Sequence, residues 1–324
     1  MLYFNSFEIN SGWGEECFRS KSFNKLNIQT INIDYRKNRF GLCKILFKIS
    51  DFDLCLIQKG DFFPLEIIKS INRPKILYYT DIISRFNSSD HLFKSKLFDM
   101  YLVRSQLCKK TLIEKGWVES DKIKIHLSGF DPTIYQKLKM KKDIDLLFVG
   151  TLTDRRKRII EKIRKHFNIR IVKAFSHEAC KYYNKAKIIL NIHGDQFLDT
   201  EIRIFEVLGS GGFLITEKLG DENPFGINDL VQFNNFDDLI QKISFYLNSP
   251  KERETISDNG YKKVHKCHTY DHRAIELKKV FINLNSHFKS SAVDYKQIYK
   301  YSYIEPILKL KDYIRLRTRV KQYF

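Results

Sequence analysis

The chain has few cysteines, and no two of them are close together in the sequence. Only six of the 324 residues are cysteine, and the motif CxxC does not occur. A chain of this length can build a hydrophobic core without disulfide staples. We therefore expect reduced thiols, and the pattern excludes the class of small disulfide-rich secreted proteins.

Long apolar runs are absent as well. No stretch approaches the about 18 apolar residues that a membrane-spanning helix requires. The first residues, MLYFNSFEINSGWGEE, show neither a basic start nor a long apolar segment, so we expect no signal peptide. These absences predict a cytoplasmic protein, with peripheral attachment to the inner face of the cell membrane as the alternative.

Familiar motifs for phosphate and metal binding are also missing. The pattern GxxxxGK[ST] does not occur, which excludes a P-loop. The triplet DFD at 51–53 resembles a metal-binding DxD motif, but it precedes an expected strand, so we interpret it as a turn. We predict no metal site and no cofactor.

Negative charge is scarce relative to positive charge. The chain has 57 Lys and Arg against 38 Asp and Glu, a net charge of +19. Such a balance favours anionic partners: nucleic acid, anionic lipid or phosphate-bearing small molecules. The alternative is compositional bias, because the chain is also rich in Asn, Ile, Phe and Tyr. The basic residues are spread along the chain and form no recognised nucleic-acid-binding module, so we predict no nucleic-acid partner.

Short apolar runs alternate with amphipathic stretches along most of the chain. This alternation predicts an α/β fold with two doubly wound, Rossmann-like parallel-sheet domains that face a cleft, where ligands bind outside the carboxyl ends of the strands. We predict domains at 1–140 and 141–285, joined by a polar linker near 133–142, and a basic helical tail at 286–324. The expected strands lie at 2–5, 28–33, 53–58, 75–80, 100–105, 122–127, 144–150, 169–175, 188–193, 212–216 and 230–233.

Residues 201–215, EIRIFEVLGSGGFLI, combine a short helix with a turn of small residues. Asp199 or Thr200 can cap the helix, which then runs to about Leu208. Arg203 and Glu206 lie one turn apart near its start, where a guanidinium adds to the attraction of a helix N-terminus for phosphate. A carboxylate one turn on can accept the two hydroxyls of a ribose. The alternative is an exposed salt bridge of little energetic value.

The small residues of this turn are Gly209, Gly211 and Gly212. They end the helix and let the next strand pack closely. We also expect them to let a ligand approach the backbone.

A second stretch, DLLFVGTLTDRRKRII, contains a strand, a loop and the start of a helix. Gly150 and Thr151 follow the strand, and the helix begins near Asp154 with several basic residues. A diphosphate can bind at such a turn, with Arg155 or Arg156 reaching it. The alternative is a solvated basic helix face.

The ordered set IDLLFVGTLTDRR, AKIILNIHGD, EIRIFEVLGSGGFLITE, the stretch from NFDDLIQK to GYKKV, and HTYDHR resembles the C-terminal domain of CgeB-like glycosyltransferases. These belong to the group-1 glycosyltransferases of the GT-B fold. The resemblance implies a nucleotide-sugar donor in the C-terminal domain and an acceptor held mainly by the N-terminal one. It implies that Glu206 binds the donor ribose and that Arg155, Arg203 and Asn191 occupy family positions, as do the small residues from Gly209 to Gly212. Many retaining relatives carry a further glutamate, and here that position is Leu198, so the stereochemical outcome stays open.

The resemblance implies a hexosyl-type, metal-independent glycosyltransferase with a UDP- or GDP-type sugar donor. The acceptor is a glycan, a lipid-linked molecule or a protein. Arg203 with Arg155 or Arg156 would stabilise the diphosphate that leaves, and Asp81, after an expected strand, could act as a general base. The alternative for Asp81 is a helix cap. The alternatives for the whole chain are a module that binds a sugar nucleotide without transferring the sugar, or a nucleic-acid-binding protein.

The tail EPILKLKDYIRLRTRVKQYF predicts a basic amphipathic helix that starts at Pro306. Such a helix can lie on an anionic membrane. The alternative is a helix that packs back on the domains.

Overall fold

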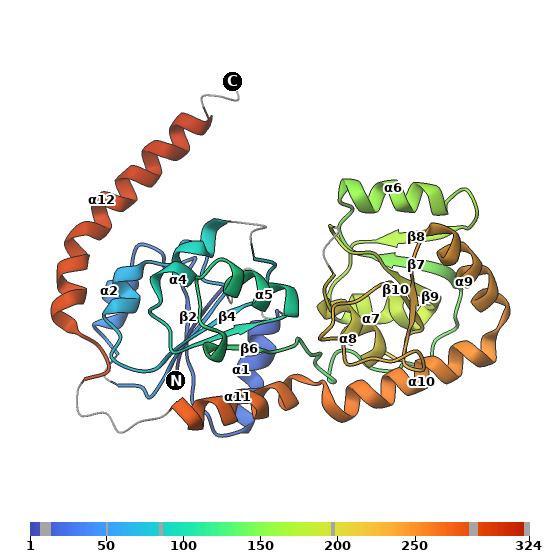
Figure 1. The fold of residues 1–324 in the computed structure, drawn as a ribbon, viewed down its shortest axis with the longest axis horizontal. Helices are drawn as coiled ribbons and strands as arrows, with labels where there is room; N and C mark the ends of the chain where they lie inside the picture. Colours follow the sequence, from blue (N-terminus) through green and yellow to red (C-terminus); the bar gives the residue numbers. More distant parts are fainter. Residues whose placement is uncertain (7–13, 50, 84–86, 196–197, 285–290, 321–324) are drawn as a thin grey trace. The chain divides into compact units, whose positions relative to one another are not determined.

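The structure is a computed structural model that describes residues 1–6, 14–49, 51–83, 87–195, 198–284 and 291–320. The chain forms two compact units (Figure 1). Unit 1 comprises Met1–Val103, Cys108–Lys124 and Leu277–Phe324, and unit 2 comprises Arg104–Leu107 and Ile125–Glu276. The expected linker near 133–142 therefore lies inside unit 2, and the expected tail lies inside unit 1.

Unit 1 is built on a six-stranded sheet of order β2-β1-β3-β4-β5-β6, in which β1 pairs in parallel with β2 and β3, and β4 with β3 and β5. The central strands β1 and β3 are buried along their whole length, as the continuous apolar runs predicted. The strands are β1 Leu2–Asn5, β2 Ile31–Asp34, β3 Cys55–Gln58, β4 Lys75–Tyr79, β5 Met100–Val103 and β6 Ile123–Ile125. The helices are α1 Glu15–Lys25, α2 Leu42–Leu46, α3 Leu65–Lys69, α4 Asp90–Ser95, α5 Gln106–Glu114 and α12 Tyr295–Val320, with short 3₁₀ turns at Asn87–Ser89 and Ser120–Lys122.

Unit 2 is built on a parallel five-stranded sheet of order β11-β10-β9-β7-β8. Helices α6 and α9 pack their apolar side chains into one core with the strands, whereas α7 and α8 lie against the other face (Figure 1). The strands are β7 Ile144–Val149, β8 Ile169–Val172, β9 Ala186–Asn191, β10 Leu214–Glu217 and β11 Val231–Phe233. The helices are α6 Asp154–Ile163, α7 Ser176–Lys185, α8 Ile202–Gly209, α9 Phe236–Asn248 and α10 Pro250–Cys267, and α11 Tyr270–Leu284 leads back to unit 1.

Several helix starts follow from local sequence. The side chain of Thr153 accepts a hydrogen bond from the amide of Arg156 and caps α6, and Asn235 caps α9 in the same way. Pro250 occupies the first turn of α10, where its missing N–H costs nothing. Helix α8 differs from the prediction, because its N-cap is Glu201 rather than Asp199 or Thr200, and no side chain caps it.

Helix α12 begins at Tyr295, so the predicted start at Pro306 is wrong. The carboxylate of Asp294 accepts hydrogen bonds from the amides of Lys296 and Gln297, which is the signature of an N-cap. Pro306 lies within the helix, where it removes one backbone donor. The first turns of α12 pack on α2 and α3 of unit 1.

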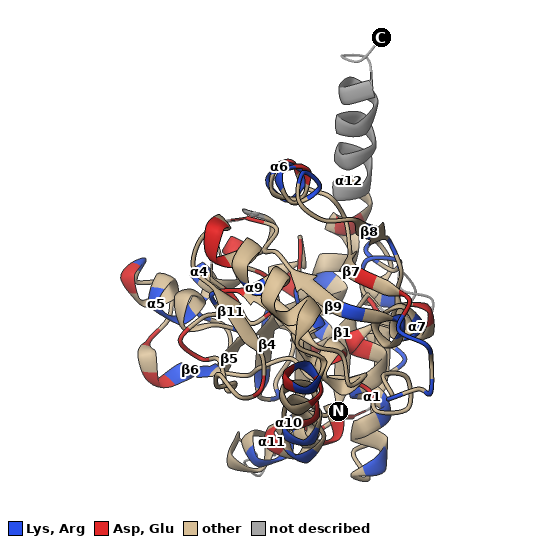
Figure 2. Ribbon diagram, turned by 90° about the vertical axis from the view of Figure 1, so that its right-hand side faces the viewer, with Lys and Arg blue, Asp and Glu red and all other residues tan. Residues whose placement is uncertain are grey.

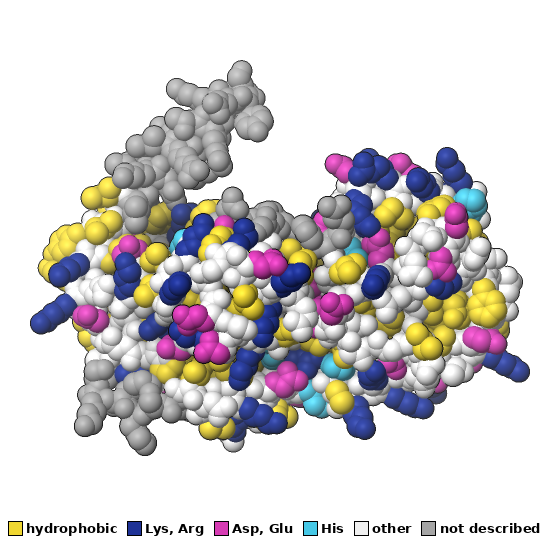
Figure 3. All heavy atoms as spheres, viewed as in Figure 1, with side chains coloured by type: hydrophobic (Ala, Val, Ile, Leu, Met, Phe, Trp, Pro, Cys, Tyr) yellow, Lys and Arg dark blue, Asp and Glu magenta, His cyan; other side chains and the backbone are white. Residues whose placement is uncertain are grey.

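Positive charge is distributed over many elements. Figure 2 shows both basic and acidic residues on α10 and α11 and mostly basic residues on α6, and Figure 3 shows basic side chains scattered among other side chains. None of the helices in the described part of the chain has the length and apolar character needed to cross a membrane. All six cysteines lie among the described residues, and none forms a disulfide.

Candidate functional site

The carboxyl edge of the unit 2 sheet contains the point where the chain reverses direction across the sheet. From β7 the chain adds β8 on one side and then returns to add β9 and β10 on the other side. The connections after β7 and β9 therefore leave the sheet in opposite directions, and open α/β sheets bind ligands at such a point. The predicted residues Gly150 and Thr151 follow β7, and Asn191 ends β9.

The start of α6 is tied to the end of β9 by three hydrogen bonds. The hydroxyl of Thr153 donates to the carbonyl of Gly194 at 3.1 Å, and Arg155 Nη1 donates to the carbonyl of His193 at 2.9 Å. Arg156 Nε donates to the carbonyl of Ile192 at 2.8 Å. These hydrogen bonds join the loop after β7 to the loop after β9 at the carboxyl edge of the sheet.

Arg203 lies directly over Gly150. The backbone of Gly150 has φ +144°, and a Cβ on it would lie only 2.9 Å from Arg203 Nη2. The backbone angle therefore favours glycine here, and a side chain at this position would displace the guanidinium. Among the described residues, Nε of Arg203 has no hydrogen-bond partner although that atom is buried.

A carboxylate and an imidazole lie beside these arginines. Glu201 Oε1 lies 3.5 Å from Arg156 Nη2 and 3.6 Å from Nδ1 of the buried His193. Although burial works in the opposite direction, His193, Arg203 and Arg156 lower the pKa of Glu201 to about 2. Burial likewise opposes the charge of His193, but Glu201 raises the pKa of this imidazole above its usual value.

Glu206, one turn after Arg203, is held by a tyrosine. The hydroxyl of Tyr135 donates a hydrogen bond of 2.7 Å to Glu206 Oε1. Glu206 is half-buried rather than exposed, so it is not part of a solvated surface salt bridge. Its carboxylate is oriented before any ligand binds.

The two arginines of α6 differ from Arg203 in their surroundings. Arg155 makes a bidentate ion pair with Glu217, the last residue of β10. Nη1 of Arg155 lies 2.9 Å from Oε2 of Glu217. Arg156 is buried and donates to backbone carbonyls, including that of Thr151 at 3.2 Å. Arg155 and Arg156 therefore hold the loops after β7 and β9 in place. Of the three arginines, Arg203 is the best placed to bind a ligand.

Four of the predicted donor-binding residues have packing roles instead. Asn191 is fully buried and donates to the hydroxyl of Thr216 at 3.1 Å, inside the sheet. Gly209 ends α8, and Gly211 and Gly212 follow it. The eight residues of α8 span roughly 12 Å, so these glycines lie at the opposite end of the helix from Arg203.

The surroundings of these glycines explain why they lack side chains. A Cβ at Gly209 would clash with the ring of Phe130, and one at Gly212 would lie 2.8 Å from Ile189 Cδ1. Gly211 has φ +67°, which favours glycine. The close packing that the sequence predicted is confirmed, but a direct role in ligand binding is not supported.

Asp81 belongs to unit 1, two residues after β4. Its Oδ1 accepts a hydrogen bond from the amide of Ile82 at 3.3 Å, and Oδ2 lies 3.8 Å from Lys59 Nζ. The described residues that follow it, up to Ile83, are not helical, and residues 84–86 lie outside the described part of the chain. Asp81 therefore lies at the carboxyl edge of its sheet as predicted, and its role as a base stays a prediction.

The unit 1 sheet also carries a buried polar network, which the sequence analysis missed. Arg19 of α1 is fully buried, donating to Gln58 Oε1 at 2.7 Å and to Glu15 Oε1 at 2.6 Å. The hydroxyl of Tyr78 also donates to Glu15, at 3.1 Å. The buried charge of Arg19 is tolerated because Arg19 is paired with Glu15 and hydrogen-bonded.

Four residues of the unit 2 site were not predicted from the sequence: Tyr135, His193, Glu201 and Glu217. Glu217 ends β10 and His193 lies two residues after β9, so their positions at strand ends were a usable signal. Tyr135 lies in the stretch expected to be a linker, where nothing in the sequence indicates a contact with α8.

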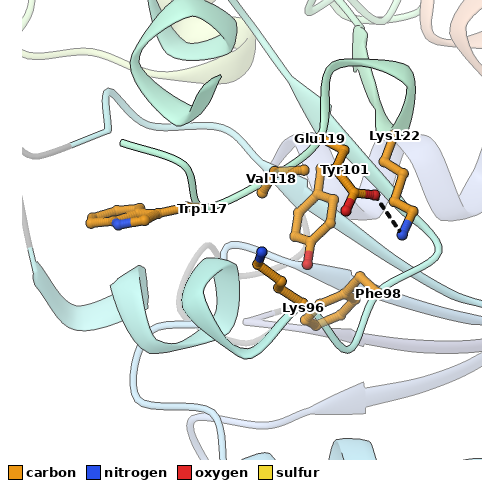
Figure 4. A pocket seen from close by; sticks show the side chains of 7 residues that line it. All are labelled: Lys96, Phe98, Tyr101, Trp117, Val118, Glu119 and Lys122. Atoms are coloured by element: carbon orange, nitrogen blue, oxygen red, sulfur yellow. Dashed lines mark ion pairs between the residues drawn. The ribbon is translucent and has the colours of Figure 1, made fainter. Parts of the chain in front are cut away.

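Neither hollow described in unit 1 fits a sugar nucleotide at the carboxyl edge. One hollow, of about 420 Å³, is lined by Met1, Leu54 and Phe281 at the amino ends of the strands. The other, of about 10 Å³, has room for roughly one water molecule. Figure 4 shows it between Lys96, Phe98 and Tyr101, with the ion pair of Glu119 and Lys122 at one side. The described residues contain no group of three or more His, Cys, Asp or Glu side chains placed to hold a metal ion.

Comparison with known proteins supports the resemblance to glycosyltransferases. Residues 133–279 match the model of a family described as glycosyl transferase-like. The chain is similar to the CgeB-like glycosyltransferases. The spore protein CgeB of Bacillus subtilis is 25% identical over 313 residues, which cover 84% of this chain and 94% of CgeB. The resemblance stated from the sequence is thereby confirmed.

Solved structures show that the fold is GT-B. The sucrose-phosphate synthase of Thermosynechococcus elongatus superposes with a TM-score of 0.65 at 10% identity, covering 87% of this chain and 98% of the synthase. Anabaena HepE in complex with UDP and glucose also gives 0.65, at 12% identity over 87% and 99% of the two chains. A glycosyltransferase from Rickettsia africae gives 0.60, at 13% identity over 87% and 97%.

Proposed function

We propose that this CgeB-like chain transfers a sugar from a nucleotide-diphosphate sugar to a glycan, a lipid-linked molecule or a protein. One observation carries the proposal: the guanidinium of Arg203 lies over the bare backbone of Gly150 at the reversal point of the unit 2 sheet. A diphosphate bound there would meet a positive charge, the start of α8 and a strand end without a side chain.

Arg203 would act on the leaving group. When the bond between sugar and diphosphate breaks, negative charge grows on the diphosphate, and a fixed guanidinium stabilises that charge. Burial works against the charge of Arg203, but Tyr183, Glu201 and Glu206 raise its pKa, so it stays charged at any physiological pH. The negative charge of Glu201 does not neutralise Arg203 completely, because Glu201 also pairs with His193 and Arg156.

Glu206 would hold the donor ribose. Its carboxylate accepts hydrogen bonds only, and the two hydroxyls of a ribose are donors at suitable spacing. The complexes of HepE contain UDP, which makes UDP the first nucleotide to test here. We place acceptor binding in unit 1, with Asp81 as the candidate base if the reaction inverts the anomeric centre.

Nucleotide binding to matched variants tests the donor site. Calorimetric titration of the wild type with UDP, GDP, dTDP and CDP should identify one preferred diphosphate. Arg203→Gln should weaken its binding by about tenfold to a hundredfold, the usual cost of a lost hydrogen bond to a charged group. Glu206→Ala should weaken nucleotide binding in the same range.

The control is Arg158→Gln, which removes the same charge from an exposed position on α6 and should leave affinity unchanged. If Arg203→Gln and Arg158→Gln bind the diphosphate as well as the wild type, the assignment of the site is wrong.

A second candidate function is donor binding without transfer. It is motivated by Leu198, which stands where many retaining relatives have a glutamate. A wild type that binds the diphosphate but neither hydrolyses nor transfers the matching nucleotide sugar, over a broad acceptor set, would favour this function over transfer.

A further inference from the structure

Helix α12 has one face committed to unit 1. Ile298, Tyr301 and Glu305 follow one another at helical spacing and are buried against α2 and α3. Near the start of the helix, Tyr295 stacks on Phe47 and donates a hydrogen bond to the carbonyl of Ile49 at 2.8 Å. These contacts fix which side of the helix faces away from unit 1.

The opposite side carries large apolar and aromatic residues in solvent. We call it the outer face of α12: Tyr299, Tyr303, Ile304 and Ile307, which are 56%, 61%, 48% and 55% exposed. The rings of Tyr299 and Tyr303 meet edge to face at 5.0 Å, and their hydroxyls are hydrogen-bonded. Figure 3 shows hydrophobic side chains gathered over the first turns of α12, at the left-hand edge. A contiguous exposed patch of this kind marks an interaction site.

The charges along α12 indicate the kind of partner. Lys296 and Lys300 are exposed on the same turns as the outer face. Further along the helix the sequence has Lys309, Lys311, Arg315, Arg317 and Arg319, against the single acid Asp312. Tyrosine is favoured at the boundary between lipid and water, isoleucine is favoured in the acyl region, and lysine reaches anionic headgroups.

We propose that the outer face of α12 docks on an anionic lipid bilayer, with Ile304 and Ile307 entering the acyl boundary and the tyrosines at headgroup level. The apolar residues and the basic residues occur together on a helix, which is the pattern of an interfacial helix. The buried face keeps α12 attached to unit 1, so docking would bring the proposed acceptor unit to a membrane surface. The proposal does not depend on the identity of the donor.

Vesicle flotation of the full chain tests the proposal. We expect the wild type to float with phosphatidylglycerol–phosphatidylcholine vesicles and not with pure phosphatidylcholine vesicles. The triple variant Tyr303→Ser, Ile304→Ser, Ile307→Ser should bind at least about tenfold more weakly, since binding scales with buried apolar area. Replacing Lys296 and Lys300 by Gln should weaken binding by roughly fivefold for each charge.

The matched control removes exposed apolar side chains from unit 2. Ile227→Ser with Phe245→Ser, at 87% and 54% exposure, should float like the wild type. All variants should keep the thermal midpoint of the wild type and its affinity for the preferred nucleoside diphosphate, because every substituted side chain is exposed. These readouts separate a failure of this proposal from a failure of the donor site.

Two results would overturn the proposal. The first is equal flotation of the wild type and the triple variant, or flotation of neither. The second is that vesicles bind neither protein, while the wild type forms a concentration-dependent oligomer or binds oligonucleotides and the triple variant does not. That result would assign the outer face to a second copy of this chain or to nucleic acid.

Discussion

Tyr135 orients the carboxylate of Glu206 through one hydrogen bond of 2.7 Å. If Glu206 binds the ribose, Tyr135→Phe should weaken UDP binding by about threefold to tenfold, because the carboxylate loses the donor that fixes its position. The same variant should discriminate less between UDP and its 2′,3′-dideoxy analogue. Tyr182→Phe on α7 is the control, and equal discrimination in Tyr135→Phe and the wild type would refute the positioning role.

His193 gives the unit 2 site a pH dependence. Its pKa is raised in the folded protein by Glu201, despite burial, so the imidazolium is favoured more in the folded state than in the unfolded state, where the pKa is 6.5. This contribution to stability is complete below about pH 6.5 and is lost as the pH rises through the folded pKa.

Thermal midpoints between pH 5.5 and 9 check this prediction. The midpoint of the wild type should fall with rising pH more steeply than that of His193→Gln or Glu201→Gln. His166→Gln, at an exposed position, should keep the steep fall. Parallel curves for the wild type and His193→Gln would contradict the assignment.

At the scale of elements, the C-terminal end of α8 depends on close packing against Phe130. Gly209→Ala would place a methyl group into this ring, and overpacking of a filled core costs about 1–3 kcal/mol. We expect a lower free energy of unfolding by denaturant, with partial recovery in Gly209→Ala, Phe130→Leu. Affinity for the preferred nucleoside diphosphate should be unchanged, because the substitution lies at the far end of α8 from Arg203. A variant as stable as the wild type would show that this end of the helix is loosely packed.

The sequence predicted most elements because parallel strands are continuous apolar runs and their helices are amphipathic. It missed α4, a six-residue helix whose sequence DHLFKS is too short for a clear period. It misplaced the start of α12, since proline is favoured in the first turn of a helix and Pro306 looked like a start. The true start depends on Asp294, a signal that was present but not used.

The candidate site could be predicted only in part. Gly150, Arg203 and Glu206 follow from strand ends and helical spacing, which the sequence displays. The pairing of Arg155 with Glu217 and the burial of Asn191 depend on the order of strands in the sheet, which the sequence does not display. Tyr135 reaches Glu206 from 71 residues away, and no local pattern reports such a contact.

At the scale of the whole molecule, the excess of positive charge is not gathered into one binding surface. Basic residues lie together with acidic ones on α10 and α11, and a separate basic run lies on α6 (Figure 2). In the described part of the chain, three of the nine buried side-chain atoms without a hydrogen-bond partner lie near the carboxyl edge of the unit 2 sheet: Asn191 Oδ1, His193 Nδ1 and Arg203 Nε. Buried groups of this kind mark a place where a ligand or water completes the hydrogen bonding.

Hydrogen exchange of the wild-type chain with and without its preferred nucleoside diphosphate tests the central claim most directly. We predict slower exchange in the peptides that cover 150–156 and 201–206, and unchanged exchange in those that cover 96–122. Protection confined to 96–122, or to the amino ends of the unit 1 strands, would contradict the account and place the nucleotide site elsewhere.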